Sequence, residues 1–351
     1  MIAMQHSSGL RADALLLGRA ALAGLRQPAG PFKVTAAITW VCEQHCQHCN
    51  IWRREQGAEM SAMEWRQIWR EARSTLSWID LTGGEVTSRG DFAEIAISAI
   101  EELPELAMLH FPSNGSDPQR LERVVRSIRD AGPRRLVVSI SLDGPPRMHD
   151  RIRGEKGAFA SAVASFVRLR NLGVAAYFGM TLSPINEDYL HETMLALREQ
   201  VPDLSWRDLH HNFIHTSGHY FGNEDMVRLT PQRMTDLAEE VMKLRGLPRS
   251  PTELLERLYL REVASYARSG HSPRPCTSLA GNCFIAPSGT VHPCHIWDQP
   301  IGGLPAAGYS LAQLWRKAPA LRARTGVRDQ SCPGCWTPCE AYPTILSNYL
   351  V

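Results

Sequence analysis

The chain has 351 residues and a formal net charge of only +2, with 38 lysines and arginines against 36 aspartates and glutamates. So small a charge argues against a nucleic-acid partner, and 44% hydrophobic residues argue against a disordered chain. No run of 18 apolar residues predicts a transmembrane helix, and the first ten residues lack the pattern of a secretory signal. We therefore expect a folded cytoplasmic protein.

The first expected element is a helix with a broad apolar face, over residues 10–26. Docking of this face on the protein core is the favoured interpretation. Contact with a membrane surface or with a partner is the alternative, because an amphipathic helix can serve either purpose.

Between residues 32 and 247, apolar segments alternate regularly with amphipathic ones. The expected strands cover residues 34–41, 78–81, 107–111, 135–142, 174–182 and 204–214. The expected helices cover residues 61–75, 92–103, 118–131, 159–172, 188–201 and 231–244, and Ser61 with Glu64 forms a capping box for the first of them. Alternating strands and helices imply a parallel sheet, and near-continuous apolar strands imply burial on both faces. We predict an α/β fold, a partial (β/α)6 TIM-like barrel, with an open doubly wound sheet as the alternative.

Beyond residue 250 the composition changes. One more helix is expected over 252–269, followed by a stretch dense in proline, glycine and cysteine with a hairpin over 283–294. Such a segment has little core of its own, so bonds to a metal or cluster would have to hold it together. The expected division is an N-terminal helical extension (1–31), the barrel (32–247) and a small Cys-rich domain (248–351).

The nine cysteines fall into two groups, with none between residues 50 and 275. An odd count, this bunching and the lack of an export signal favour metal or cluster ligation over a disulfide framework. The first group is Cys42, Cys46 and Cys49, spaced C-x3-C-x2-C directly after the first expected strand. Three thiolates leave one iron of a [4Fe–4S] cluster open, whereas His45 or His48 could complete a zinc site, and spacing alone leaves both possibilities.

This placement of C-x3-C-x2-C resembles the defining motif of the radical S-adenosylmethionine (SAM) enzymes. Residues 81–85 (LTGGE), after the second strand, are similar to the Gly-Gly-Glu motif of that family, which implies that Gly83, Gly84 and Glu85 bind the SAM amino group. Glycines allow close backbone approach, and a carboxylate pairs with an ammonium.

A third similarity follows the fourth strand, in residues 139–154 (SISLDGPPRMHDRIRG). It implies that Ser141 and Arg153 hold the SAM carboxylate or ribose, and an arginine fork suits a carboxylate. Asn114, after the third strand, matches a Thr-Asn-Gly position of the family, and Thr181, on the fifth strand, is a further candidate for the adenine or ribose. A strand-end serine, a surface arginine and a plain turn at Asn114 are the alternatives.

The second cysteine group resembles the auxiliary-cluster domains of the same family, called SPASM or, when shorter, twitch. The shorter pattern implies four ligands, Cys276, Cys294, Cys332 and Cys335, and the fuller pattern would add Cys283 and Cys339. One auxiliary [4Fe–4S] cluster is the first expectation and two clusters the second. A zinc knuckle formed by Cys332, Cys335 and Cys339 is the alternative.

Candidate substrate contacts lie in the sixth strand and the loop after it, where residues 206–220 contain four histidines. His210, Asn212 and His215 are the candidates, and core packing, solvent exposure or a metal site are the alternatives. Strand alternation sends His210 and His211 to opposite faces, which argues against a joint metal site.

The resemblance implies an enzyme that reductively cleaves SAM at a [4Fe–4S] cluster to a 5′-deoxyadenosyl radical and removes a hydrogen atom from a substrate. Dehydrogenation, epimerisation and C–C or C–S bond formation all remain open as outcomes. Because few residues precede the first strand, a small molecule, sugar or lipid is the first expectation for the substrate, and a peptide is the alternative. A zinc-stabilised α/β binding protein is the distant alternative. An electron donor such as flavodoxin or ferredoxin is the expected partner.

Overall fold

The computed structural model describes residues 2–25 and 28–349, with side chains in the first helix from residue 11 onward. A single nine-stranded sheet runs through the molecule in the order β6-β5-β4-β3-β2-β1-β7-β8-β9. Its first six strands are parallel and follow the chain order, as predicted from the alternation of strands and helices. They are β1 (Lys33–Thr39), β2 (Trp78–Gly83), β3 (Met108–Ser113), β4 (Leu136–Ser141), β5 (Ala175–Leu182) and β6 (Leu209–Phe213).

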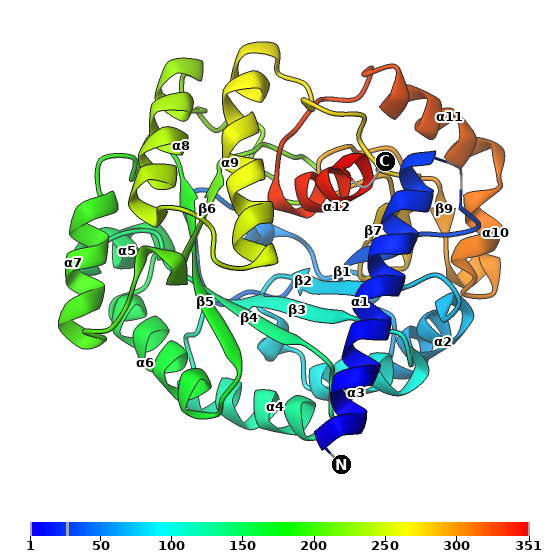
Figure 1. The fold of residues 1–351 in the computed structure, drawn as a ribbon, viewed down its shortest axis with the longest axis horizontal. Coiled ribbons are helices and arrows are strands. Elements are labelled where there is room, and N and C mark those ends of the chain that lie inside the picture. The colour runs from blue at the N-terminus through cyan, green and yellow to red at the C-terminus, as the bar shows by residue number, and fades with distance from the viewer. Residues whose placement is uncertain (1, 26–27, 350–351) are drawn as a thin grey trace.

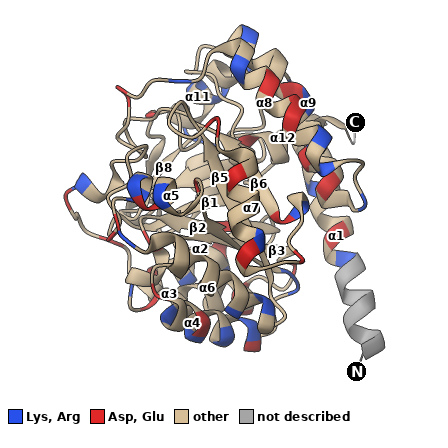
Figure 2. Ribbon diagram, turned by 90° about the vertical axis from the view of Figure 1, so that its left-hand side faces the viewer, with Lys and Arg blue, Asp and Glu red and all other residues tan. Residues whose placement is uncertain are grey.

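The helices pack around this sheet, as Figure 1 shows. Those that follow the six strands are α2 (Ala62–Ala72), α3 (Phe92–Glu102), α4 (Pro118–Asp130), α5 (Pro146–Arg153), α6 (Ala158–Asn171), α7 (Leu190–Gln200) and α8 (Pro231–Arg245). The predicted capping box is present, because Ser61 accepts from the backbone of Glu64 while the Glu64 side chain accepts from the backbone of Ser61. Positively and negatively charged residues are mixed along α3, α4 and α6 in Figure 2, as expected for a small net charge.

The sixth strand is shorter than predicted. The prediction began it at residue 204, but residues 206–208 form a single 3-10 turn, and β6 begins only at Leu209. The reason is a second capping box, in which Ser205 and Asp208 satisfy each other's backbone N–H groups. Polar capping therefore overrides the apolar pattern at this position.

The Cys-rich segment joins the barrel sheet. Its predicted hairpin exists as β7 (Asn282–Ile285) and β8 (Thr290–His292), which pair antiparallel, with the two-residue β9 (Gly302–Gly303) beyond them. However, β7 also pairs parallel with β1. The sequence did not indicate this pairing, because a four-residue strand gives no sign of its distant partner.

The remaining helices are α9 (Pro251–Ser269), α10 (Leu311–Trp315), α11 (Ala318–Arg328) and α12 (Pro338–Tyr349). Of these, only α9 was predicted. Helix α12 contains Pro343, a residue that normally argues against a helix interior, so its sequence gave no clear helical signal.

Helix α1 (Ile2–Leu25) docks on the protein as the favoured interpretation expected. It buries small and apolar side chains against the amino-terminal ends of β1, β2 and β3, in a cluster of Ala12, Leu16, Ala20, Ala23, Phe32, Trp78 and Ala107. Arg19 ties the helix down by donating to the carbonyl of Leu76 (3.0 Å) and pairing with Glu105 (2.6 Å). Among the described residues, no helix combines the length and hydropathy that crossing a bilayer requires.

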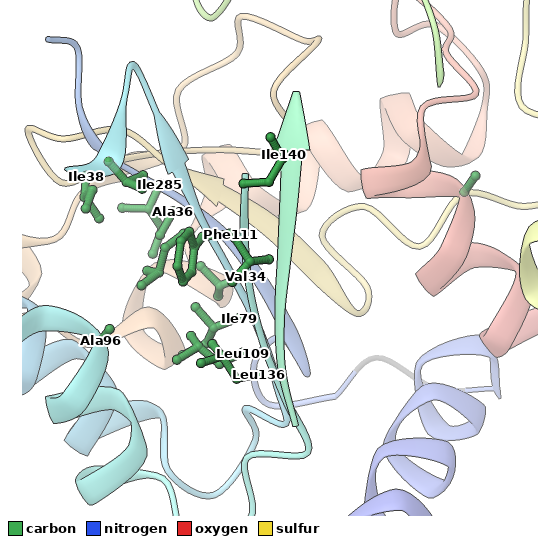
Figure 3. Packing of buried hydrophobic residues seen from close by; sticks show 14 of the residues in the cluster. Val34, Ala36, Ile38, Ile79, Ala96, Leu109, Phe111, Leu136, Ile140 and Ile285 are labelled. Carbon is green, nitrogen blue, oxygen red and sulfur yellow. The ribbon is translucent and has the colours of Figure 1, made fainter. Parts of the chain in front are cut away.

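The core lies between the strands and the surrounding helices. Figure 3 shows Ile79, Leu109 and Leu136 gathered on the side of the strands that faces the helix of Ala96. Burial on both faces was predicted for all strands and is correct for β1 and β2, but wrong for β3 to β6. In those four strands buried residues alternate with partly exposed ones. The partly exposed residues lie on the inner face of the sheet, which borders the interior of the barrel.

Candidate active site

The three cysteines of the first group surround one cavity. Cys42, Cys46 and Cys49 lie in the loop after β1 and line a cavity of about 190 Å³ at the carboxyl ends of the parallel strands. Backbone bonds fix this loop to the segment that ends α5, from His45 N–H to the Arg153 carbonyl (3.1 Å) and from Gln47 N–H to the Ile152 carbonyl (2.8 Å). The thiols are therefore held by rigid neighbours at the edge where parallel α/β folds place their chemistry.

The same cavity collects most of the other residues that the sequence singled out. It is lined by Gly83, Gly84, Glu85, Asn114, Ser141, Arg153, Thr181, Asn212 and His215. These residues come from the ends of five different strands and from α5. Only His210, of the candidates for SAM or substrate contact, does not line it.

The two glycines of the Gly-Gly-Glu segment bring β2 against the cysteine loop. Gly83 has a φ of +131°, and a Cβ added there would lie 2.1 Å from the Thr39 carbonyl oxygen. A Cβ on Gly84 would lie 2.0 Å from the Val41 carbonyl oxygen. Hydrogen bonds close the contact, from Gly84 N–H to Thr39 (2.9 Å) and from Glu85 N–H to Val41 (2.8 Å). The absence of a side chain at these two glycines therefore allows β2 to lie against the cysteine loop and to position it.

Glu85 is 2% exposed and almost fully hydrogen-bonded. Its Oε1 accepts from the hydroxyls of Ser113 (2.9 Å) and Thr87 (2.7 Å), and its Oε2 accepts from the Asn114 N–H (2.7 Å). Burial raises the pKa of this carboxyl, although the backbone N–H of Asn114 and the side chain of Thr87 oppose the shift. Because Oε2 has only one partner among the described residues, it retains a lone pair for a cationic group in the cavity.

Arg153 lies between a carboxylate and a cysteine. Its Nη2 is 2.6 Å from Asp143 Oδ2, and its Nη1 lies 3.6 Å from the Cys46 sulfur. Burial disfavours both charges, yet the guanidinium keeps the pKa of Asp143 below its usual value, and Asp143 keeps the pKa of Arg153 above its usual value. A permanent cation next to a sulfur favours the thiolate that metal ligation requires.

Burial disfavours the thiolate forms of the three cysteines in the protein alone. Burial raises the pKa of Cys42 and of Cys49 to about 12 and also raises that of Cys46, where the charge of Arg153 opposes the shift. All nine cysteines of the chain are free of disulfides. Buried and half-buried thiols on one loop fit a site whose ligands lose their protons on binding iron or zinc.

Asn114, Ser141 and Thr181 complete the rim. The side-chain amide of Asn114 donates to Glu43 (3.1 Å), and its Oδ1 accepts from the Ser116 N–H (3.0 Å). The Thr181 N–H donates to Asp143 Oδ1 (3.0 Å), which aligns β5 with the Asp143–Arg153 pair.

Asn212 and His215 both line the cavity, and hydrogen bonds fix the ring of His215. His215 is 5% exposed, and both ring nitrogens are engaged, with Nδ1 2.8 Å from the Phe213 carbonyl and Nε2 accepting from the Trp336 N–H at 3.1 Å. Burial lowers the pKa of His215 to about 4, so the ring is neutral. His215 thus joins the loop after β6 to the carboxyl-terminal segment.

His210 faces another part of the interior. Its Nδ1 lies 3.2 Å from Glu256, and its ring packs edge-on against Tyr177 at 4.6 Å. His211 points to the opposite face, as predicted, and is 2% exposed. The two histidines therefore do not form a joint site.

Sequence reasoning missed several residues that line the cavity, namely Gln44, Trp52, Tyr220, Phe221, Asn223 and Thr337, and considered His48 only as a zinc ligand. Gln44 and His48 lie between the cysteines of the motif, and this position was the one sequence feature that could have predicted their place in the cavity. Tyr220 and Thr337 come from distant loops, and the hydroxyl of Tyr220 bonds to that of Thr82 (2.7 Å). Only the fold brings these loops to the cysteines.

Four cysteines of the second group share another cavity. Cys276, Cys294, Cys332 and Cys335 line a space of about 620 Å³, together with Glu340. Cys283 does not line this cavity, because it lies on β7 and is packed in the apolar core at 1% exposure. Cys339 does not line it either. The structure thus groups the four cysteines of the shorter pattern and separates the two additional ones.

The two cavities are close along the chain. Cys335 lines the second and Thr337 the first, and the Trp336 N–H between them donates to His215. The carboxyl-terminal segment therefore forms a wall shared by both sites.

The sequence model of the Radical SAM superfamily matches residues 37–197. The chain is 25% identical over 325 residues to "PqqA peptide cyclase" of Ruegeria pomeroyi (87% of this chain, 79% of that protein). It is 23% identical over 307 residues to "Sporulation killing factor maturation protein SkfB" of Bacillus subtilis (87% and 69%). It is 26% identical over 334 residues to "AdoMet-dependent heme synthase" of Nitratidesulfovibrio vulgaris (86% and 83%).

A solved structure shares the fold. The crystal structure of Streptococcus suis SuiB bound to precursor peptide SuiA aligns with a TM-score of 0.61 at 14% sequence identity, over 88% of this chain and 72% of that one. At this identity the likeness concerns the fold alone.

Proposed function

Because this chain belongs to the radical SAM superfamily of enzymes, we propose that it is a peptide-modifying member that installs a cyclisation, crosslink or other radical modification. Two relatives matched over most of the chain support this proposal, since one is named a peptide cyclase and another a maturation protein. They favour a peptide over the small molecule, sugar or lipid expected first from the sequence.

One structural observation carries the site assignment. The C-x3-C-x2-C thiols, the Gly-Gly-Glu segment and Arg153 line a single cavity at the strand ends. When bound there, a [4Fe–4S] cluster reduced by one electron would, with SAM, supply the radical chemistry that removes a hydrogen atom from the substrate.

The protein's own part follows from the contacts. Cys42, Cys46 and Cys49 would ligate the cluster, and Arg153 would stabilise the thiolate form of Cys46. The free lone pair of Glu85 suits the SAM ammonium, and Ser141, Thr181 and Asn114 offer polar groups on the rim. Asn212 is the cavity residue we assign to substrate contact, whereas His215 would act through position alone.

We further propose that Cys276, Cys294, Cys332 and Cys335 hold one auxiliary [4Fe–4S] cluster. Four thiols around one cavity fit the four-cysteine ligation of such a cluster. An external one-electron donor of the flavodoxin or ferredoxin class would serve the first site.

The test is anaerobic reconstitution followed by chemical reduction with SAM. We expect about eight irons per chain, the content of two [4Fe–4S] clusters, and formation of 5′-deoxyadenosine. Short peptides encoded beside the gene, deuterated at candidate positions, should transfer deuterium to 5′-deoxyadenosine. Colourless protein that holds only zinc would contradict the assignment.

A tetrapyrrole substrate is the second candidate, because one relative is named a heme synthase. The two are distinguished by which compound stimulates SAM cleavage and loses a hydrogen. Stimulation by a tetrapyrrole and by none of the peptides would overturn the peptide proposal.

A further inference from the structure

Cys339, one of the two cysteines outside the second cavity, belongs to a different cluster. Its sulfur, a ring nitrogen of His295 and a carboxylate oxygen of Glu340 all lie within 4.8 Å of one another. His295 comes from the loop after β8, and the other two residues form the first turn of α12. His295 and Glu340 are each 3% exposed, so their polar atoms cannot rely on water.

The histidine and the carboxylate form a buried pair. The Nδ1 of His295 lies 3.1 Å from Glu340 Oε2. Glu340 Oε2 also accepts a hydrogen bond from the hydroxyl of Thr337 at 2.7 Å. A histidine beside a carboxylate that a second donor holds in place is a common arrangement around protein metal ions.

The neighbouring positive charge is already compensated. Lys33 donates to the carbonyl of Cys339 (2.8 Å) and to Thr35 (3.0 Å), and its ammonium pairs with Asp80 at 2.8 Å. A bound cation would therefore meet a thiolate and a carboxylate with little net opposition from Lys33.

We propose that Cys339, His295 and Glu340 hold a mononuclear divalent cation of the zinc class, separate from the auxiliary cluster. Sulfur, imidazole and carboxylate ligands together suit zinc, whose bonds of about 2.0 to 2.3 Å place neighbouring ligands about 3.5 Å apart. The observed separations thus need only small side-chain movements. Three protein ligands leave a fourth position for water or a substrate donor.

The site does not depend on the proposed substrate. Glu340 also borders the cavity of the four cysteines. His295 follows Cys294 in the chain, but neither His295 nor Cys339 lines that cavity. The sequence grouped Cys339 with possible cluster ligands, whereas the structure assigns it to a second kind of metal site.

The experiment measures zinc and iron together on the anaerobically reconstituted holoenzyme after equilibrium dialysis against Zn²⁺. We expect one zinc per chain in addition to the iron of both clusters. Cys339→Ala and Glu340→Gln should each lower zinc affinity at least about tenfold while the iron content stays unchanged. Cys283→Ala, which removes a buried thiol elsewhere, should keep both metals. Zinc-edge X-ray absorption should show one sulfur at about 2.3 Å and lighter ligands near 2.0 Å.

Two results would overturn the proposal. A holoenzyme that binds no more zinc than Cys339→Ala has no such site. Loss of about four irons in Cys339→Ala would make Cys339 a cluster ligand instead. Glu340→Gln keeps the size of the side chain, so it decides the question even where the alanine variant folds poorly.

Discussion

The two cysteine groups are supported in different ways. The first lies on a loop that follows a buried strand and is bonded through its backbone to β2 and α5. The second draws its cysteines from three separate stretches, around Cys276, around Cys294 and at 332–335, which all lie in loops between helices and strands. A site built on strand ends is positioned by the fold, whereas a site built between loops depends more on the group it binds.

The largest effect is expected from the first group. Cys46→Ala should abolish SAM cleavage, because it removes a proposed cluster ligand, the sulfur that Arg153 faces. Formation of 5′-deoxyadenosine should fall to the level of an enzyme-free control, measured by liquid chromatography. Cleavage at an unchanged rate would separate this cavity from the chemistry.

The next effect concerns the second group alone. The double variant Cys276→Ala/Cys335→Ala should lose about four of about eight irons and still cleave SAM without substrate. Iron analysis and the cleavage assay on the same sample check this. Loss of all the iron would show that the two sites do not load independently.

A smaller effect should follow from the glycine that brings β2 to the cysteine loop. Gly83→Ala forces a Cβ to within 2.1 Å of the Thr39 carbonyl at a φ of +131°, so it should cost at least about 1–3 kcal/mol of unfolding free energy. Gly90→Ala, where a Cβ meets nothing within 4 Å, is the matched control. Equal urea midpoints for the two variants would contradict the close approach seen here.

The smallest effect concerns His215, the buried ring that joins the loop after β6 to the carboxyl-terminal segment. The folded-state pKa of His215 is about 4, below the unfolded value of about 6.5, so its stabilising contribution is present above pH 6.5 and is lost as the pH falls towards 4. The stability advantage of the native enzyme over His215→Gln should therefore shrink by about 2 kcal/mol between pH 7.5 and pH 5, measured by urea unfolding. A constant difference would mean that burial in the folded protein does not hold His215 neutral.

Local signals explain what the sequence predicted well. The alternation of strands and helices predicted the six parallel strands, and Ser61 with Glu64 predicted the start of α2. The C-x3-C-x2-C and Gly-Gly-Glu segments predicted the cavity because each follows a strand, and parallel strand ends meet at one edge.

Long-range contacts account for the rest. Strand β7 pairs with the distant β1, and Tyr220 and Thr337 reach the first cavity from distant loops. Cys339 lies outside the cavity of the four other cysteines and close to His295, which is far from it in the chain. No local pattern encodes such contacts. His210 was misplaced for a related reason, since its partner Glu256 lies on α9.

We propose that only the first cavity holds a cluster that binds SAM. The most direct test is the electron paramagnetic resonance spectrum of the reduced Cys276→Ala/Cys335→Ala variant, which we expect to retain only the first cluster. We predict one [4Fe–4S]⁺ signal whose g values change when SAM is added. A signal that SAM leaves unchanged, or no iron–sulfur signal at all, would contradict the account.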